Sequence, residues 1–387
     1  MKITQIYDLV NPVTAEILGD SGVIEEDLSN LVQVGTTIQN IDNWQNKFVS
    51  ALVDRIGRTI FVNRPYSGSA PSVMMDAWEY GSILMKIGSE MPEASENESW
   101  ELEDGASYDP FVYKASPAYA KFYDGLVTFE LDKSILDRQL KSSFSSPTEL
   151  NSFVSMLFNE VDKSMTVKND ALVMRVINSL AADTMYNLDS GGSYSGKTGN
   201  RAVNLLYLYN QAFGQSVTAA AALHTEAFLR YASYIMGLYV KRLSKISTLF
   251  NIGGKQRFTP ADMLHVVLLD EFEKSAGVYL YNAANNFNTE NLKFPNAETV
   301  PFWQGPGTDY SFSNTGKIHV KSGAGNTVEA GGILGVMFDR DACGVCNQNS
   351  RVTTQYNPKA EFTNYFYKRD ARYFTDSNEN FVVFYVA

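Results

Sequence analysis

The chain has 387 residues, and its 32 basic and 43 acidic side chains give a formal net charge of −11. Charged residues make up only 19% of the chain and aromatic residues 13%, whereas charged residues make up roughly 25% of a typical soluble domain. The shortage of charge predicts that something else covers part of the surface. A negative total without a polybasic block argues against sequence-specific nucleic-acid binding as the main task, although it does not forbid lying beside DNA.

The length favours two or three domains with a core that needs no covalent staples. Two cysteines, at positions 343 and 346, exclude a disulfide-rich secreted framework and favour a reducing compartment. The N-terminus lacks the apolar run of a secretory signal, and no run of about 18 apolar residues occurs. We therefore expect a soluble, cytosolic chain without a membrane span.

Two elements are predicted in the first 57 residues. Weak alternation of polar and apolar residues, interrupted by Pro12, Gly19 and Gly22, predicts an extended arm up to about residue 40. Between Ile41 and Ile56 apolar residues recur at steps of three and four. This spacing predicts an amphipathic helix that Gly57 ends.

Residues 58–130 are rich in glycine and proline, which excludes long helices. Short apolar runs predict strands at Ser82–Ile87, Phe111–Ala115 and Leu126–Leu131. The segment Glu90–Asp109 carries many carboxylates and neither Lys nor Arg. We expect a long two-stranded ribbon with an acidic tip. Because an isolated ribbon is marginally stable, it should lie on its own body or on a neighbour.

A long helix begins after Ser146, with Pro147 at its first position and Glu149 three residues after the cap. The apolar period continues to about Tyr186, which corresponds to a helix of roughly 60 Å. We expect a break near Thr166–Asn169. Helices of this length usually serve as a spine or as an oligomer contact.

The second half mixes helices and strands without a regular βαβ repeat, so the predicted class is α+β. The Gly- and Ser-rich stretch Leu188–Asn200 predicts a domain boundary. The predicted elements that follow are helices at Ala202–Ala212, Ala219–Leu249 and Glu271–Tyr281, a buried strand at His265–Leu269 after the turn Thr259–Asp262, loop-rich sequence at Asn282–Gly316, strands at Ile318–Val320 and Ile333–Phe338, and aromatic-rich strands over 351–386.

The sharpest enzymatic pattern is the pair Cys343 and Cys346, whose spacing suits thiol exchange or half of a zinc site. A redox pair opens a helix, whereas this pair follows a strand and precedes an Asn- and Ser-rich stretch. A zinc site needs further ligands, and the chain has no other cysteine. We therefore favour two small residues in a loop.

For the remaining candidate sites, a structural role is a simpler explanation than catalysis or ligand binding. His224, His265 and His319 are widely separated and accompany no nucleophile motif, so they are expected to be structural. The glycines of 323–327 and 331–332 match no phosphate-binding pattern and fit hairpin turns. The acidic segment lacks the register of a calcium loop.

Aromatic residues are dense in the last forty positions, and they fit either a stacking platform for sugars or bases or a packed core with subunit contacts. We favour packing. The residues concerned are Tyr356, Phe362, Tyr365, Phe366, Tyr367, Tyr373, Phe374, Phe381, Phe384 and Tyr385.

The order of these elements resembles the major capsid protein of tailed bacteriophages, which has the Hong Kong 97 shell fold. The sequence TIQNIDNWQNKFVSALVDRIGRTI at 37–60 is similar to the segment before the extended loop in short-tailed phages of Gram-positive hosts. GGILGVMFDRDACGVC and NYFYKRDARYF resemble a strand and the closing sheet of such proteins. The order covers nearly the whole chain.

The resemblance implies five segments. They are an N-terminal arm and helix at 1–57, an extended loop at 58–130, a peripheral domain with the spine helix at 131–198, an axial domain at 199–340, and a return to the peripheral domain at 341–387.

The resemblance also implies a structural protein of the virion, assembled in the host cytoplasm. It would form hexamers and pentamers of an icosahedral shell around packaged double-stranded DNA, with a separate scaffolding protein, a portal and decoration proteins as partners. Some relatives crosslink Lys to Asn, but no such Lys or Asn can be aligned here. We expect no enzyme activity, no catalytic, cofactor-binding or metal-binding residue, no cofactor and no membrane contact.

Two other hypotheses remain open from the residues. The first is an oxidoreductase or zinc enzyme that uses Cys343 and Cys346. The second is a carbohydrate-binding surface protein that uses the aromatic C-terminal region. Large assembly interfaces are poor in charge and rich in aromatic residues and Met, and this composition favours the shell protein.

Overall fold

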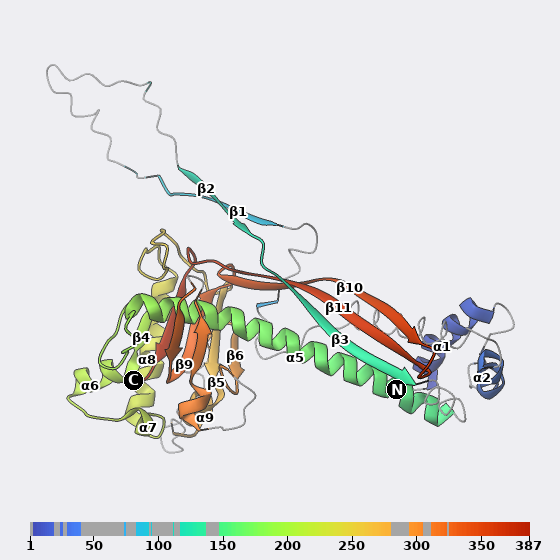
Figure 1. Ribbon diagram of the computed structural model, residues 1–387. Coiled ribbons are helices and arrows are strands. Elements are labelled where there is room, and N and C mark those ends of the chain that lie inside the picture. Colours follow the sequence, from blue (N-terminus) through green and yellow to red (C-terminus); the bar gives the residue numbers. More distant parts are fainter. Residues whose placement is uncertain are drawn as a thin grey trace. The chain divides into compact units, whose positions relative to one another are not determined.

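The computed structural model describes residues 3–18, 24–25, 29–39, 73–74, 83–92, 94, 111, 117–136, 147–279, 294–304, 311–322 and 325–387. The chain forms two compact units. The first unit contains Met1–Tyr80, Gly125–Val173 and Val345–Tyr373, and the second contains Gly81–Asp124, Met174–Gly344 and Phe374–Ala387. Helices and strands mix in the chain (Figure 1), which confirms the α+β class.

The first unit contains a three-stranded sheet with the order β10-β11-β3. Strand β3 spans Leu126–Leu136, β10 spans Cys343–Asn357 and β11 spans Phe362–Thr375. Strands β3 and β11 are antiparallel, with Leu136 opposite Phe362 and Leu126 opposite Arg372. Alternate residues of β11, including Tyr365 and Tyr367, are buried, so one face of this sheet forms core.

The N-terminal region is helical, so the prediction of an extended arm up to residue 40 is wrong for the described residues. Helix α1 spans Ile3–Leu18 and helix α2 spans Leu31–Gln39. Pro12 lies inside α1, where it lacks the N–H for one backbone hydrogen bond. Val10 and Val13 on either side of it are 0% and 1% exposed, and their burial outweighs that loss.

Helix α5 spans Pro147–Leu188, which confirms the predicted long helix. The break predicted near Thr166–Asn169 is wrong, because α5 is continuous. Val161, Met165 and Leu172 are buried at helical spacing around this stretch, so packing overrides the weak helix propensity of its β-branched residues. The boundary between the two units falls within α5, after Val173.

The second unit is built on a five-stranded sheet with the order β4-β12-β9-β5-β6. Pairs β12–β4 and β5–β6 are parallel, and pairs β12–β9 and β5–β9 are antiparallel. Every residue of the three central strands is buried, so both faces of this sheet are covered. The strands are β4 (Ala202–Asn204), β5 (Leu264–Leu269), β6 (Ala297–Val300), β9 (Ile333–Asp339) and β12 (Phe381–Tyr385).

Helices of the second unit cover this sheet. Helix α6 contacts β12, and α9 contacts β5 and β6. The ring of Tyr239 on α8 lies edge-on to that of Phe384, with centroids 5.2 Å apart. Trp303 is 1% exposed and donates from Nε1 to the Ile333 carbonyl at 2.9 Å. The helices are α6 (Leu205–Phe213), α7 (Ala219–Ala222), α8 (Glu226–Leu243), α9 (Asp270–Tyr279) and α10 (Phe312–Thr315).

Several predictions for this half are confirmed and others need correction. The strands at His265–Leu269, Ile318–Val320 and Ile333–Phe338 and the helix from Glu271 are confirmed. The helix predicted from Ala202 begins three residues later, because residues 202–204 pair with β12 as β4. Asn204 then caps α6 by accepting the Tyr207 N–H at 3.0 Å.

Two further predicted elements need correction. The predicted helical stretch Ala219–Leu249 is two helices, and α8 ends at Leu243. The stretch predicted to be loop-rich, Asn282–Gly316, contains β6 and α10.

The hairpin turns predicted for the two glycine-rich stretches are confirmed at one of them. Strands β7 (Ile318–Lys321) and β8 (Thr327–Ala330) form an antiparallel hairpin whose turn contains Gly325. Gly331 and Gly332 connect β8 to β9, which belongs to another sheet, so the hairpin predicted there is wrong.

Strands β1 (Leu84–Ser89) and β2 (Ala118–Tyr123) run side by side as a two-stranded antiparallel ribbon (Figure 1). The ribbon and its first strand are therefore confirmed. The second strand begins after Pro117, not at Phe111, which lies in a turn. Residues 112–115 and the helix predicted at Ile41–Ile56 lie outside the described residues. None of the described helices is long and apolar enough to cross a membrane.

Candidate functional site: the ionic anchor of the ribbon

The ribbon β1–β2 has two faces of different chemistry. Alternate residues of both strands are partly buried, and the residues between them are exposed. On the partly buried face, Lys86 lies directly opposite Lys121. Two like charges at opposed positions repel each other across a strand pair. This register is therefore stable only if acidic groups compensate both ammonium groups.

The turn between β11 and β12 supplies those acidic groups. Asp376 receives Lys86 Nζ at 3.0 Å on Oδ2 and Lys121 Nζ at 2.9 Å on Oδ1. Glu379 accepts from Lys86 Nζ at 2.8 Å. The Asp376 carboxylate is fixed by its own turn, because Oδ1 also accepts the Asn378 N–H at 3.0 Å. One buried carboxylate thus bridges the two strands of the ribbon.

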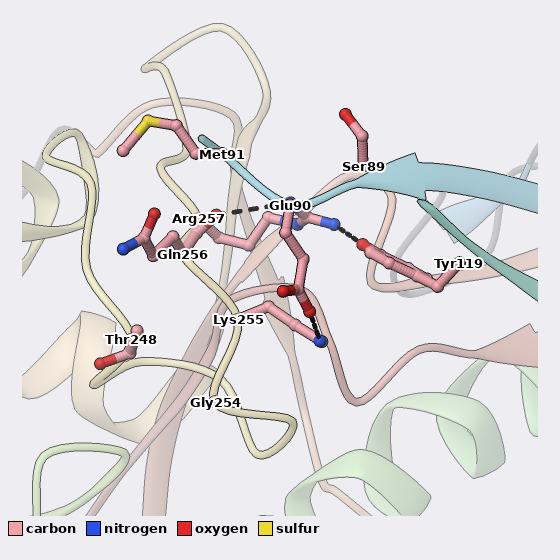
Figure 2. Close-up of a pocket in the computed structure, with 9 residues that line it drawn as sticks. All are labelled: Ser89, Glu90, Met91, Tyr119, Thr248, Gly254, Lys255, Gln256 and Arg257. Carbon is pink, nitrogen blue, oxygen red and sulfur yellow. Dashed lines mark hydrogen bonds and ion pairs between the residues drawn. The ribbon is translucent and has the colours of Figure 1, made fainter. Parts of the chain in front are cut away.

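Tyr119 makes the second part of the anchor (Figure 2). It lies opposite Gly88, where an added Cβ would come within 2.6 Å of the tyrosine ring, so the glycine leaves room for it. Lys255 and Arg257 approach the ring at 5.2 and 5.8 Å from its centroid, within the range of cation–π attraction. The Arg257 guanidinium also donates to the Tyr119 hydroxyl.

The two cations come from the loop between α8 and β5. Ser247 and Arg257 exchange backbone hydrogen bonds of 2.9 and 3.0 Å, which fix this loop. Arg257 Nε lies 3.3 Å from Glu379 Oε1, and Lys255 forms an ion pair with Glu90, at the end of β1. Glu90, Tyr119, Lys255 and Arg257 are among the residues that line a pocket of about 250 Å³ (Figure 2). We name Lys86, Glu90, Tyr119, Lys121, Lys255, Arg257, Asp376 and Glu379 the ribbon anchor.

The surroundings of the anchor favour the charged forms of Lys86 and Asp376. Burial alone would lower the pKa of Lys86, but its hydrogen bonds and charge interactions with Glu379 and Asp376 raise that pKa overall. Burial alone would raise the pKa of Asp376, but the Asn378 N–H and the two lysines lower it overall. The arrangement holds the two strands of the ribbon against the turn after β11 through ion pairs.

The structure separates the two cysteines of the predicted redox or zinc pair. Cys343 and Cys346 lie on β10 and are 0% and 3% exposed, so the prediction that they occupy a loop is wrong. Residues three positions apart on a strand have Cα atoms about 10 Å apart and face opposite sides of the sheet. A disulfide needs Cα atoms within about 7 Å. Burial raises the pKa of the Cys343 thiol to about 12. These thiols are core residues.

The three histidines lie in separate places, and only His265 is buried. His224 lies in an exposed turn, not in the predicted Ala-rich helix, and His319 is exposed on β7. His265 is 9% exposed on β5 and stacks on Phe338, with centroids 5.9 Å apart. Within the described ranges, no three His, Cys, Asp or Glu side chains are placed to hold a metal ion.

Most of the aromatic residues of the C-terminal region pack inside the protein, whereas Tyr356 on β10 is 40% exposed. Tyr365, Tyr367, Phe381, Phe384 and Tyr385 are at most 2% exposed, which confirms core packing and contradicts a stacking platform built from these residues. Sequence reasoning missed the ribbon anchor, because its members come from four distant segments. The one available signal was Lys86 in the predicted strand Ser82–Ile87, because Lys121 lies outside every predicted strand.

An α+β fold whose ribbon is held by ion pairs, and whose thiols and most C-terminal aromatic rings lie in the core, fits a structural subunit. The sequence profile of the Phi29-like phage major capsid proteins matches residues 10–385. The chain belongs to this family. It is thus a structural component of the virion, the major capsid protein of a tailed-phage icosahedral head.

Comparison with solved structures gives distant similarities to phage capsids. The capsid of Staphylococcus phage Andhra is 8% identical, with 81% of this chain and 83% of that chain covered and a TM-score of 0.48. The mature capsid of bacteriophage PhiM1 is 9% identical, with 84% and 88% covered and a TM-score of 0.46. The capsid of cyanophage P-SCSP1u is 11% identical, with 82% and 86% covered and a TM-score of 0.47. Comparison with curated proteins gave no match.

Proposed function

We propose that this capsid protein has the Hong Kong 97 shell fold and assembles into hexamers and pentamers around double-stranded DNA. In this proposal the chain divides into the five segments 1–57, 58–130, 131–198, 199–340 and 341–387. A scaffolding protein, a portal and decoration proteins are its partners during assembly in the host cytoplasm. The low charge content supports extensive contact between copies, because large assembly interfaces are depleted in charge.

The proposal depends on the exposed apolar residues of the ribbon's outer face. Met85, Ile87 and Phe122 are 52%, 66% and 62% exposed, and Met85 lies directly opposite Phe122. The inner face is held by ion pairs, so the ribbon keeps its apolar face turned outward. Contiguous apolar surface of this kind marks an interaction site. We propose that it lies on a neighbouring copy in the shell.

The test is a triple variant in which Met85, Ile87 and Phe122 are each replaced by Ser. The unassembled subunit should keep its stability within about 1 kcal/mol, since more than half of each side chain is already in water. Particle yield, measured by light scattering and negative-stain microscopy, should fall at least tenfold. Val278→Ser on α9, where Val278 is 70% exposed, is the matched control and should assemble normally. A triple variant that assembles like the parent chain would refute the proposed contact.

The net charge supports a container for DNA more than a DNA-binding protein. A total of −11 repels phosphate, so DNA can slide past the lining during packaging. We expect isolated subunits to bind duplex DNA weakly in gel-shift titrations at low salt. A tight complex that dissociates when salt is added would contradict this part of the proposal.

A further inference from the structure

Strand β10 forms one edge of the three-stranded sheet in the first unit. Residues 349–355 of this strand are exposed or half-buried at every position. An edge strand presents unpaired N–H and C=O groups on its outer side at every second residue. Such an edge fits one kind of partner, which is another extended backbone.

The composition of this edge does not protect it. Residues 349–355 read NSRVTTQ and contain no Lys, Pro, Asp or Glu, the residues with which proteins commonly guard an edge. The single charge belongs to Arg351, whose guanidinium forms an ion pair with Asp370 on the neighbouring strand β11. Val352, Thr353 and Thr354 are β-branched and favour extended backbone.

The opposite edge of the same sheet is guarded. Strand β3 carries Glu130, Asp132 and Lys133, and the first and third form ion pairs with Lys368 and Glu160. Because the two edges belong to one sheet, this difference does not follow from the general composition of the fold. The difference indicates that the edge of β10, unlike that of β3, is available to pair with another strand.

Among the residues that the structure describes, β10 has one pairing besides β11. This is the parallel bridge between Met74 and Val345, four residues before the segment 349–355. The exposure of the segment shows that its side chains are accessible in the single chain.

We infer that residues 349–355 of β10 pair with an extended segment of a second copy of this chain in the assembled shell. The inference rests on the proposed self-assembly. Each copy carries a net charge of −11, so copies repel each other over most of their surface. The segment and its partner strand β11 carry four basic residues and the single acid Asp370, which pairs with Arg351, so this edge is locally basic and an acidic second copy can approach there. Backbone hydrogen bonds with that copy then satisfy the outward N–H and C=O groups of the edge strand.

The first test is hydrogen–deuterium exchange of the full-length chain in unassembled subunits and in purified particles. The outward amides of residues 349–355, which do not donate to β11, should exchange at least tenfold more slowly in particles. Amides of the exposed turn 190–193 serve as the internal control. Protection of these outward amides already present in the unassembled subunit, or their unchanged exchange in particles, would overturn the inference.

The second test uses the two substitutions Thr353→Pro and Thr354→Pro. Consecutive residues of a strand point their N–H groups to opposite sides, so one substitution removes an outward donor and the other removes a donor to β11. The outward variant should keep the stability of the subunit and lose particle formation at least tenfold. The other should destabilise the subunit itself.

These outcomes separate the inference from the proposed function. Normal assembly of the variant that keeps subunit stability would overturn the inference alone. Failure of the parent chain to form particles would overturn the proposed self-assembly. If both proline variants unfold, the exchange measurement on the parent chain decides.

Discussion

Replacing Asp376 with Asn should release the ribbon from the body of the second unit. Asp376 is 2% exposed and holds Lys86 and Lys121 at 3.0 and 2.9 Å. Asparagine keeps the shape and can still accept hydrogen bonds, but it removes the negative charge between the two opposed ammonium groups. Their repulsion then acts directly on the β1–β2 pairing.

The magnitude follows from the burial of the partners. Removing one member of a fully buried ion pair costs about 3–5 kcal/mol. Here the lysine side chains keep 26% and 34% of their exposure, so water partly restores their solvation and we expect a loss of about 2 kcal/mol. Glu379 still pairs with Lys86, which limits the loss at that lysine.

The assay combines urea unfolding of the unassembled subunit with hydrogen–deuterium exchange. Amides of 84–89 and 118–123 should exchange faster in the variant than in the parent chain. Asp262→Asn, the same substitution at an exposed position, is the control and should change stability by less than about 0.5 kcal/mol. Ribbon exchange equal to the parent, with unfolding within the same limit, would refute the role of the anchor.

Three other predictions test the fold and the site. Gly332 has φ +69°, and an added Cβ would lie 2.0 Å from the Val386 carbonyl oxygen. Gly332→Ala should therefore destabilise the subunit by at least about 2 kcal/mol in urea unfolding. Gly331→Ala should not, because an added Cβ at that position meets no atom within 4 Å. Cys343 and Cys346 should not react with a thiol reagent at pH 8 until the protein unfolds, and rapid labelling of the native chain would contradict their burial. The pKa of Asp376 is lowered in the folded chain, so the stability that this carboxylate contributes should be constant above its unfolded pKa of about 4. This contribution should be lost as the pH falls through the folded pKa. Ribbon amides that are equally protected at pH 3 and pH 7, after correction for intrinsic exchange, would contradict this.

Local patterns predicted the elements whose packing agrees with their own sequence. The spine helix has a cap signal and a long apolar period, and it forms over Pro147–Leu188. The apolar run His265–Leu269 predicts a buried strand, and every residue of β5 is buried. The ribbon was predicted because glycine and proline exclude helices there. In each case the local signal and the tertiary environment favour the same structure.

Elements that depend on distant residues were not predicted. Residues 202–204 were predicted as the start of a helix, but β12 holds them as a strand from nearly two hundred residues away. Pro12 suggested an arm, whereas burial of Val10 and Val13 stabilises a helix through it. The ribbon anchor joins β1, β2, the loop before β5 and the turn after β11. No local spacing connects such segments, because only the folded chain brings their charges within 3 Å.

The mass of the native particle tests the central claim most directly. The full-length chain, expressed and purified under a range of ionic conditions, should form high-mass particles that light scattering detects and negative-stain microscopy shows as closed shells. A stable monomer under every ionic condition, with no high-mass species, would contradict the claim that this chain is a self-assembling shell subunit.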